Sequence, residues 1–285
     1  MKIGVIFVNV GPKSGDSMIE LAQLAEQAGV ESVWTGEHVI IPLDYESKYP
    51  YNDDGKMGAD PENNLVDPLI SLAAIAGATK TIRLGTGVNI LPQANPLLMA
   101  KQVAGLDFVS NGRLDLGLGI GWLREEFDAM GVPYERRGAR FDDYVQAMRK
   151  VWSGETVEHQ SDFISWTNFK SYPLPVQDPL PIHMGGDKGK IFERTAKYGN
   201  GWFTPRLSLE EVQSGMASIA EECGKIGRDP SEIEITTMWA MQGGLDTVKQ
   251  YEDAGVARML LPMLIFGSDH KAGLKMLGDE VISKL

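Results

Sequence analysis

NPLLMAKQVAGLDFVSNGRLDLGLGI, residues 95–120, contains a helix, a turn and a strand in immediate succession. Asn95 offers an N-cap side chain and Pro96 suits the first helical position, so a helix is predicted over 97–109. A Ser-Asn-Gly turn follows, and the apolar run at 113–120 predicts a strand. This order of elements is typical of a fold in which strands and helices alternate.

The same alternation continues on both sides of this stretch. Apolar runs predict eight strands, over residues 3–8, 32–35, 82–88, 113–120, 182–184, 201–204, 233–237 and 258–261. Helical periodicity predicts a helix after each strand, over residues 17–28, 67–76, 97–109, 125–130 with 141–152, 190–198, 209–226, 247–254 and the C-terminal end. Asp16 or Ser17 is expected to cap the first helix.

Eight strand–helix units in 285 residues predict an α/β protein, a single TIM (β/α)8 barrel domain over residues 1–285. An open, doubly wound sheet is the alternative that the same rhythm allows. The first strand is not followed by Gly-x-Gly-x-x-Gly, which disfavours a dinucleotide-binding sheet.

Two segments are too long or too irregular to be simple connections. Residues 42–66 are rich in Gly, Pro, Asn and Asp, and a loop of this length predicts part of an active site. Residues 163–181 combine strand-like and proline-rich composition, and they predict an insertion that lies over the barrel. Both insertions are expected at the carboxyl ends of the strands, where TIM barrels hold their active sites.

Charge and composition exclude several classes of partner. The net charge of −12 disfavours nucleic acid and anionic membrane surfaces, because both need clustered Lys and Arg. No apolar run reaches the ~18 residues that span a bilayer, and no signal-peptide pattern is present. The single cysteine, Cys223, cannot form an intrachain disulfide, which suits the cytoplasm. It is either a catalytic thiol or a small apolar residue on a helix, and its acidic neighbours favour the second.

Glu37 and His38 follow the second predicted strand and are the first candidate site. Histidine titrates near neutral pH, so His38 at a strand end suits proton transfer. A surface histidine beside a surface glutamate is the alternative. Among the other histidines, His183 lies within a predicted strand and is expected to fill the barrel interior.

Glycines mark two further strand ends. Gly85 and Gly87 weaken the end of the third strand and predict either a bulge or the close approach of a flat ligand. Alternating glycines within 116–122 clear one side of the fourth strand. They either admit a ring system into the barrel or make room for large neighbouring side chains.

A third glycine-containing strand end, Gly185-Gly186, precedes a predicted helix. Free backbone N–H groups at such a position favour a phosphate, and a plain left-handed turn is the alternative. Lys188, Lys190 and Arg206 would attract an anion there, whereas Asp187 would repel it.

Together these segments resemble the bacterial luciferase-like monooxygenase superfamily, and most closely its deazaflavin-dependent oxidoreductases of actinobacteria. The resemblance covers residues 1–205 in order. The stretches that carry it are WTGEH (34–38), YPY (49–51), DG (54–55), RLGTGV (83–88), NPLLMAK (95–101), LDFVSNGR (106–113), GIGWLREEF (119–127), MGVP (130–133), RG (137–138), GG (185–186) and GNGW (199–202).

The resemblance implies a barrel with a cofactor ring over the strand ends. It implies a non-prolyl cis peptide at Gly87-Val88, forming a bulge that backs the ring, and a phosphate site at Gly185-Gly186. His38 would face the reacting carbon, with Glu37 orienting it. The residues expected to bind the cofactor are Gly87, Val88, Ile120, Gly121, Trp122, Glu125, Met184, Gly185, Gly186 and Arg206.

The sequence departs from one branch of this superfamily. The sugar-phosphate dehydrogenases have a glutamate acid after the fourth strand, where this chain has Trp122, with Glu125 and Glu126 three and four residues later. This puts that particular activity in doubt. Asp187 also replaces the small residue that often follows the two glycines.

The predicted function is hydride transfer between the deazaflavin coenzyme F420 and an unidentified small organic substrate. With FMN as the cofactor, the enzyme would instead be a luciferase-like monooxygenase. A non-catalytic flavin-binding barrel is the third hypothesis. The resemblance also implies a homodimer formed by helices of the first half, and no metal, nucleic-acid or membrane partner is expected.

Overall fold

Strands and helices alternate along the chain because β-branched apolar runs alternate with segments of helical periodicity. The computed structural model describes residues 1–205, 207–267 and 269–285. Within these ranges the barrel strands are β1 (Lys2–Ile6), β2 (Ser32–Thr35), β3 (Arg83–Thr86), β5 (Leu114–Gly119), β8 (Ile182–Gly185), β9 (Gly201–Thr204), β10 (Glu234–Met238) and β11 (Arg258–Pro262). The α-helices are α1 (Gly15–Gln27), α2 (Pro68–Ala78), α3 (Pro96–Ser110), α4 (Arg124–Ala129), α5 (Arg137–Trp152), α6 (Ile191–Tyr198), α7 (Leu209–Ile226), α8 (Gly244–Asp253) and α9 (His270–Glu280). The 3-10 turns are η1 (Leu91–Gln93), η2 (Pro230–Glu232), η3 (Met263–Phe266) and η4 (Ile282–Lys284).

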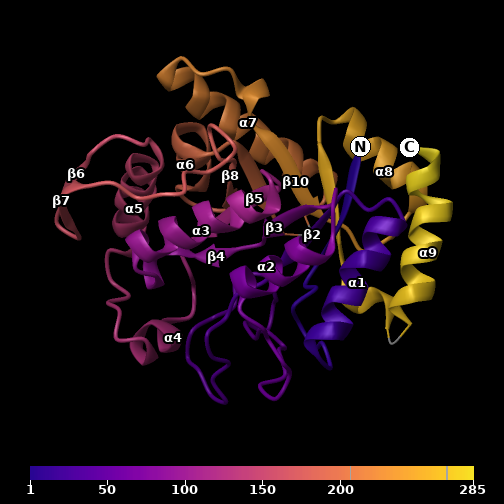
Figure 1. Cartoon of the computed structure of the whole chain (residues 1–285). Coiled ribbons are helices and arrows are strands. Elements are labelled where there is room, and N and C mark those ends of the chain that lie inside the picture. Colours follow the sequence, from indigo (N-terminus) through magenta and orange to yellow (C-terminus); the bar gives the residue numbers. More distant parts are fainter. Residues whose placement is uncertain (206, 268) are drawn as a thin grey trace.

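The strands close into a parallel ring. Neighbours pair in the order β3-β2-β1-β11-β10-β9-β8-β5, and a β3–β5 pairing completes the circle. Helices surround the ring, with α1, α2 and α3 side by side in front of the strands (Figure 1). The predicted TIM barrel is therefore confirmed, and the open-sheet alternative is wrong.

Capping side chains set the helix ends. Asn95 Oδ1 accepts hydrogen bonds from two backbone N–H groups in the first turn of α3, as predicted, and Asp67 Oδ1 accepts one at the start of α2. The predicted cap of α1 is wrong. Ser14 caps this helix, because it forms a reciprocal capping box with Ser17 that satisfies two backbone N–H groups.

The third barrel strand stops before its predicted end. β3 ends at Thr86, the peptide bond between Gly87 and Val88 is cis, and the chain resumes as β4 (Asn89–Ile90), which pairs with β5. The bulge and the cis bond expected at Gly87-Val88 are both confirmed.

A buried ion network closes the amino-terminal end of the barrel. Arg258 has 1% of its surface exposed and donates to Glu31 (2.9 Å) and Asp115 (3.4 Å). Burial would raise the pKa of Asp115, but hydrogen bonds from Arg83 and His183 hold it far below its usual range. His183 is a barrel-interior residue, as expected, and the opposite end of the barrel is left for chemistry.

The polar loop at 42–66 follows β2 and extends below the barrel in Figure 1, at the carboxyl ends of the strands. Its position there is as predicted. Asn9, at the rim of β1, ties the end of this loop to β2, because its Nδ2 donates to the carbonyls of Gly36 (2.8 Å) and Val66 (2.6 Å).

The segment at 163–181 does not lie over the barrel, so that prediction is wrong. It begins within an antiparallel hairpin of β6 (Val157–Gln160) and β7 (Ser165–Phe169), which lies beside α5 (Figure 1). Trp166 and Phe169 pack against the outer part of the core. The chain then reaches the amino-terminal end of β5, where Gln177 Nε2 donates to the backbone (2.7 Å). The aromatic side chains of the hairpin thus fasten it to the helix layer.

Cys223 is fully buried on α7, within the core between the strands and the helices. Burial raises the pKa of its thiol, which supports the apolar interpretation over a reactive one. Among the described residues, no helix has the length and apolar composition needed to cross a bilayer.

Candidate active site

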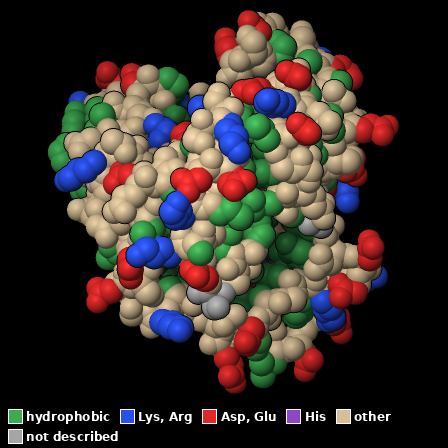
Figure 2. All heavy atoms as spheres, turned by 90° about the vertical axis from the view of Figure 1, so that its right-hand side faces the viewer, with side chains coloured by type: hydrophobic (Ala, Val, Ile, Leu, Met, Phe, Trp, Pro, Cys, Tyr) green, Lys and Arg blue, Asp and Glu red, His purple; other side chains and the backbone are tan. Residues whose placement is uncertain are grey.

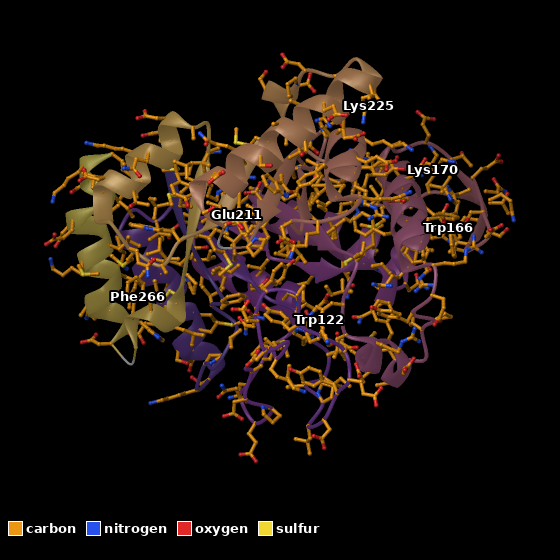
Figure 3. All side chains as sticks on the ribbon, turned by 180° about the vertical axis from the view of Figure 1, so that it is seen from behind. Trp122, Trp166, Lys170, Glu211, Lys225 and Phe266 are labelled. Atoms are coloured by element: carbon orange, nitrogen blue, oxygen red, sulfur yellow. The ribbon has the colours of Figure 1, made fainter. Side chains whose placement is uncertain are left out.

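The carboxyl end of the barrel gathers polar side chains from distant parts of the chain. Glu37 and His38 follow β2, Glu126 lies on α4 after β5, and the Gly87-Val88 bulge lies between β3 and β4. Figure 3 shows Trp122 at this end of the barrel, beside the long loop. These residues converge because the strands are parallel and all end on the same side.

His38 is held by a buried carboxylate on another element. Its Nδ1 lies 3.2 Å from Oε2 of Glu126, and its ring is edge-on to Trp122, with centroids 6.1 Å apart. The other oxygen of Glu126 accepts hydrogen bonds from the backbone N–H groups of Val39 (2.5 Å) and Ile40 (3.3 Å). One carboxylate therefore fixes both the imidazole and the backbone that follows it.

The surroundings of Glu126 favour its charged form. Burial would raise its pKa, but hydrogen bonds from His38, from Gln93 Nε2 (3.1 Å) and from the backbone of Val39 lower it. A carboxylate only accepts hydrogen bonds, so Nδ1 of a neutral His38 carries the proton. Nε2 is then unprotonated and can accept a proton from a substrate.

Glu37 makes different contacts from those predicted. Its carboxyl group accepts hydrogen bonds from Asn89 Nδ2 (2.9 Å) and from the backbone N–H of Ile90, which ties the end of β2 to β4. Burial raises the pKa of Glu37 to about 7 against the effect of these hydrogen bonds, and the charge of Glu126 adds to the rise. The prediction that Glu37 orients His38 is wrong, since Glu126 makes that contact.

The side chain of Val88 occupies a space that glycines provide. A Cβ atom on Gly119 would lie 2.6 Å from Val88 Cγ2, and one on Gly185 would lie 2.5 Å from Cγ1. A Cβ atom on Gly117 would lie 1.8 Å from the carbonyl oxygen of Thr86. The alternating glycines of β5 therefore make room for the bulge, and the alternative of a slot for a ring system inside the barrel is wrong.

Apolar side chains form the floor of the mouth beneath the bulge. A buried cluster inside the barrel consists of Ile6, Trp34, Phe203 and Leu260. The half-buried side chains that cover it are Phe7, Val88 and Met238. A flat ring would therefore lie on top of this layer rather than within the barrel.

The long loop is fastened to α4 and to Trp122, which lies two residues before it. Glu125 Oε1 accepts hydrogen bonds from the backbone N–H groups at 46–47 (2.7 and 3.1 Å). Burial alone would raise the pKa of Glu125, but hydrogen bonds from the loop lower it to about 2. Tyr45 and Tyr49 pack edge-on against Trp122, with centroids 5.8 and 5.2 Å away. Glu125 thus anchors the loop through Oε1, and its contact with the cofactor stays a prediction.

The predicted phosphate site at the end of β8 has less free backbone than expected. Gly186, with φ of +132°, donates its N–H to Phe203 O (3.1 Å), and its carbonyl accepts from Trp202 Nε1 (2.7 Å). The N–H of Gly186 is thus engaged within the barrel. Beyond it, Lys188 Nζ lies 4.0 Å from Asp187 Oδ2, so one cation there already has an acidic partner.

The remaining predicted cofactor residues differ in position. The side chain of Met184 is fully buried against the helix layer, near Gly199. Contrary to the prediction, it does not reach the mouth. Ile120 and Gly121 follow β5 and are half-buried at the rim. Arg206 lies outside the described residues.

Sequence reasoning missed the residues that hold the rim together, namely Glu126, Gln93, Asn89 and Asn9. Asn9, Asn89 and Gln93 are single polar residues between apolar neighbours, whereas Glu126 lies among other charged residues of α4. No local rule assigns any of the four a partner. Glu126 stood next to the predicted Glu125, but only the closed ring shows which of the two faces His38.

A family model described as luciferase-like monooxygenase matches residues 1–242 of the sequence, and these include every rim residue named above. The chain belongs to the luciferase-like monooxygenase family. The resemblance found in the sequence is thereby confirmed, and membership supports an enzyme of the oxidoreductase or monooxygenase type.

Relatives of this family member include a flavin-dependent enzyme and an F420-dependent enzyme. An uncharacterised protein of Mycobacterium tuberculosis is 32% identical over 209 residues, which cover 72% of this chain and 74% of the relative. The oxygenase component of a flavin-dependent trigonelline monooxygenase from Acinetobacter baylyi is 31% identical over 215 residues, covering 74% and 54%. An F420-dependent hydroxymycolic acid dehydrogenase of M. tuberculosis is 28% identical over 221 residues, covering 76% and 56%. The match thus spans just over half of the two named enzymes.

Solved structures share the fold of this family member. The F420-dependent tetrahydromethanopterin reductase of Methanopyrus kandleri has a TM-score of 0.79 and 16% identity, with 99% of both chains covered. A type II Baeyer–Villiger monooxygenase from Pseudomonas putida, in complex with FMN, has a TM-score of 0.78 and 14% identity, covering 100% and 99%. At these sequence identities, the structural similarity shows the shared barrel fold and nothing about function.

Proposed function

We propose that residues 1–285 form a single luciferase-like domain that acts as a coenzyme F420-dependent oxidoreductase on a small organic substrate. The observation that carries the proposal is the His38–Glu126 pair at the same rim as the Gly87-Val88 bulge. When a hydride moves to or from an alcohol carbon, a proton must also move at the oxygen. A fixed imidazole beside an apolar floor suits this reaction.

In this mechanism His38 Nε2 takes the hydroxyl proton of an alcohol, or returns it to a carbonyl oxygen in the reverse direction. Glu126 keeps the ring in one tautomer and stabilises the imidazolium that forms. Glu37 holds β4, and with it the bulge, against the end of β2. The deazaflavin, when bound, supplies or accepts the hydride.

The residues present fit a flat anionic cofactor. Gly87 and Val88 are half-buried at the mouth, above the apolar floor, so they would back the ring. The phosphate would lie at the rim of β8, where the exposed Lys188 and Lys190 precede α6. The further cofactor contacts that we propose are Ile120, Gly121, Trp122, Gly185 and Gly186.

Cofactor titration tests the proposal. The resemblance to the deazaflavin branch and the F420-dependent dehydrogenase relative support F420, whereas the trigonelline monooxygenase relative supports FMN. Quenching of F420 fluorescence by the purified protein is expected to give a dissociation constant at least ~10-fold below that of FMN, a difference of about 1.4 kcal/mol. Tighter binding of FMN with oxygen consumption would establish a monooxygenase instead. Tight F420 binding without turnover of any alcohol or ketone would indicate a non-catalytic barrel.

We also propose a homodimer formed through α2 and α3. The outer faces of these adjacent helices expose Ile70, Leu98, Phe108 and Val109. Exposed apolar side chains gathered on one face are typical of an interface. Light scattering is expected to give twice the chain mass of 31.2 kDa, and Phe108→Glu is expected to give the monomer. A monomeric wild-type protein at micromolar concentration contradicts the proposal.

A further inference from the structure

A hollow lies on the outside of the barrel, between the start of α3 and the end of the hairpin strand β7. Its volume is about 460 Å³, within the range of roughly 300–1,000 Å³ that small-molecule sites occupy. The residues that line it include Leu97, Leu98 and Lys101 on α3, with Phe169 and Lys170 at the end of the hairpin. We call this hollow the flank groove.

The flank groove is separate from the mouth of the barrel. The β6–β7 hairpin and α9 lie at opposite sides of the molecule (Figure 1). Figure 3 shows Lys170 and Trp166 together on the hairpin side, well away from Trp122 at the mouth. Among the described residues, those that line the groove and those of the proposed active site do not overlap. The proposed reaction therefore leaves the groove without a role.

The groove combines apolar surface with two cations. Most of its lining surface is apolar, and Leu98 has 58% of its surface exposed. Lys101 and Lys170 come from different elements, and within the described part of the chain neither ammonium group forms an ion pair with a carboxylate. On the α9 side, by contrast, acidic and basic side chains are interspersed (Figure 2), and Lys275 pairs with Asp279. In a chain with a net charge of −12, two such cations beside exposed apolar surface favour an amphipathic anion.

Contacts on both sides hold the groove in shape. Lys101 Nζ donates to the carbonyl oxygen of Tyr172, which ties the segment after β7 to α3. A carbonyl oxygen carries no net charge, so this contact does not neutralise Lys101. The hairpin is tied to α5 by Asp143, whose two carboxylate oxygens contact His159 Nε2 and Ser161 Oγ, each at 2.8 Å. The groove is thus formed before a ligand binds, which lowers the entropy that binding costs.

We propose that the flank groove is a second binding site, for an amphipathic carboxylate of the fatty-acid type. The carboxylate lies at Lys101 and Lys170, and the hydrocarbon chain covers the apolar lining formed by Leu97, Leu98 and Phe169. An inorganic anion would leave this apolar lining exposed, and an uncharged lipid would leave both cations without a partner. The proposal does not depend on the cofactor or on the reaction at the mouth.

Calorimetric titration of the whole protein with octanoate, decanoate and dodecanoate, below the concentrations at which they form micelles, tests the proposed ligand class. Affinity is expected to rise about two- to fourfold with each added methylene, as burial of a CH₂ group predicts. Decanol has the same chain without the charge and is expected to bind at least ~10-fold more weakly than decanoate. Raising NaCl from about 50 to about 300 mM should weaken the binding of decanoate but not that of decanol. Equal affinity for the acid and the alcohol overturns the proposal.

Photocrosslinking locates the bound chain, because a fatty acid could also enter the apolar mouth. A decanoate with a diazirine at the end of its chain is irradiated with the protein, and the labelled peptides are identified by mass spectrometry. Labels are expected within 95–101 and 169–171, the segments that line the groove. Labels confined to the mouth, within 36–43 or 87–88, overturn the proposal.

Two variants with matched controls assign the contacts. Lys170→Glu is expected to weaken decanoate binding at least ~10-fold and to leave decanol binding unchanged. Lys275→Glu, which makes the same change of charge on α9, should leave both unchanged. Leu98→Ser should weaken both ligands about threefold or more, whereas Ile226→Ser, a similarly exposed change on α7, should not. Equal losses in Lys170→Glu and Lys275→Glu overturn the proposal.

A second copy of the chain is the competing occupant, because Leu98 also belongs to the face proposed for the dimer. Light scattering during the decanoate titration separates the two. An unchanged molecular mass at saturation is expected, since the ligand fills a groove that is open in the assembled protein. If decanoate dissociates the assembly, or binds only to the monomeric Phe108→Glu variant, the groove is a contact between subunits and the proposal is overturned.

Discussion

Nδ1 of His38 lies 3.2 Å from Oε2 of Glu126, although 88 residues separate them in the chain. The contact joins the end of β2 to α4, across the strands between them. Glu126 is itself held by Gln93 and by the backbone of Val39 and Ile40. The imidazole is therefore oriented before a substrate arrives, as a proton-transfer group should be.

Replacement of Glu126 by Gln is expected to lower kcat about 10²-fold or more, because an amide N–H facing Nδ1 favours the wrong tautomer of His38. F420 affinity is expected to change less than about threefold, since Glu126 does not reach the cofactor floor. Steady-state turnover and fluorescence titration measure the two effects. Glu135→Gln, an exposed change in the connection between α4 and α5, is the control. Unchanged kcat in Glu126→Gln contradicts the positioning role.

Removal of the imidazole itself is expected to be more damaging. General acid–base groups contribute about 10²–10⁴-fold to rates, so His38→Ala should lose that factor in kcat while still binding F420. Added imidazole should restore part of the activity, because the space beside Glu126 remains. His270→Ala, on α9, is the control for loss of a histidine. A His38→Ala variant with full turnover removes the proton-transfer role.

Glu37 should make stability depend on pH. Its pKa is raised from 4.5 to about 7 by burial, so its protonated form is favoured in the folded state. The associated stability is present below about pH 4.5 and is lost as pH rises through 7. Glu37→Gln should therefore reduce the difference in unfolding free energy between pH 5 and pH 8 by about 2 kcal/mol. Urea unfolding at pH 5 and at pH 8 measures this difference in free energy. If the free energy of unfolding depends on pH equally in Glu37→Gln, in the wild type and in the exposed control Glu20→Gln, the assignment of this dependence to Glu37 is contradicted.

The sequence predicts the barrel well because local rules determine where its helices and strands begin and end. Asn95 caps α3 as expected, and this rule needs only a few neighbouring residues. The order of strands and helices then leaves few topologies. The hairpin beside α5 was misplaced because its composition shows that it is strand-like, but not which surface its aromatic residues cover.

The site is predicted only in part, for a physical reason. His38 stands out by its chemistry and its place after a strand, but its partner Glu126 is distant in sequence. The spacing of Gly117 and Gly119 is the same whether they admit a ligand or a neighbouring strand. Only the closed ring shows that Thr86 and Val88 fill the space opposite them.

Gly117 and Gly105 should respond oppositely to alanine. A Cβ atom at Gly117 would lie 1.8 Å from the backbone oxygen of Thr86, so the bulge would have to shift. Gly117→Ala is expected to cost about 3 kcal/mol or more of unfolding free energy and to abolish F420 binding. Gly105, inside α3, has open space around its Cβ position, so Gly105→Ala should stabilise by about 0.5–1 kcal/mol. Equal stability of the two variants contradicts the packing argument.

Glu125 should control how the long loop lies over the mouth. Its carboxylate accepts the backbone N–H groups at 46–47, so Glu125→Ala leaves both without that partner. Each lost charge-assisted hydrogen bond removes about 1.5–3 kcal/mol of local stability, enough to open the loop more often. Limited proteolysis within 42–66 is expected to accelerate at least about tenfold, and KM for the substrate should rise more than kcat falls. Asp128→Ala, an exposed change on the same helix, should leave the cleavage rate unchanged. If Glu125→Ala and Asp128→Ala are cleaved at equal rates, the loop is held by its aromatic contacts with Trp122 instead.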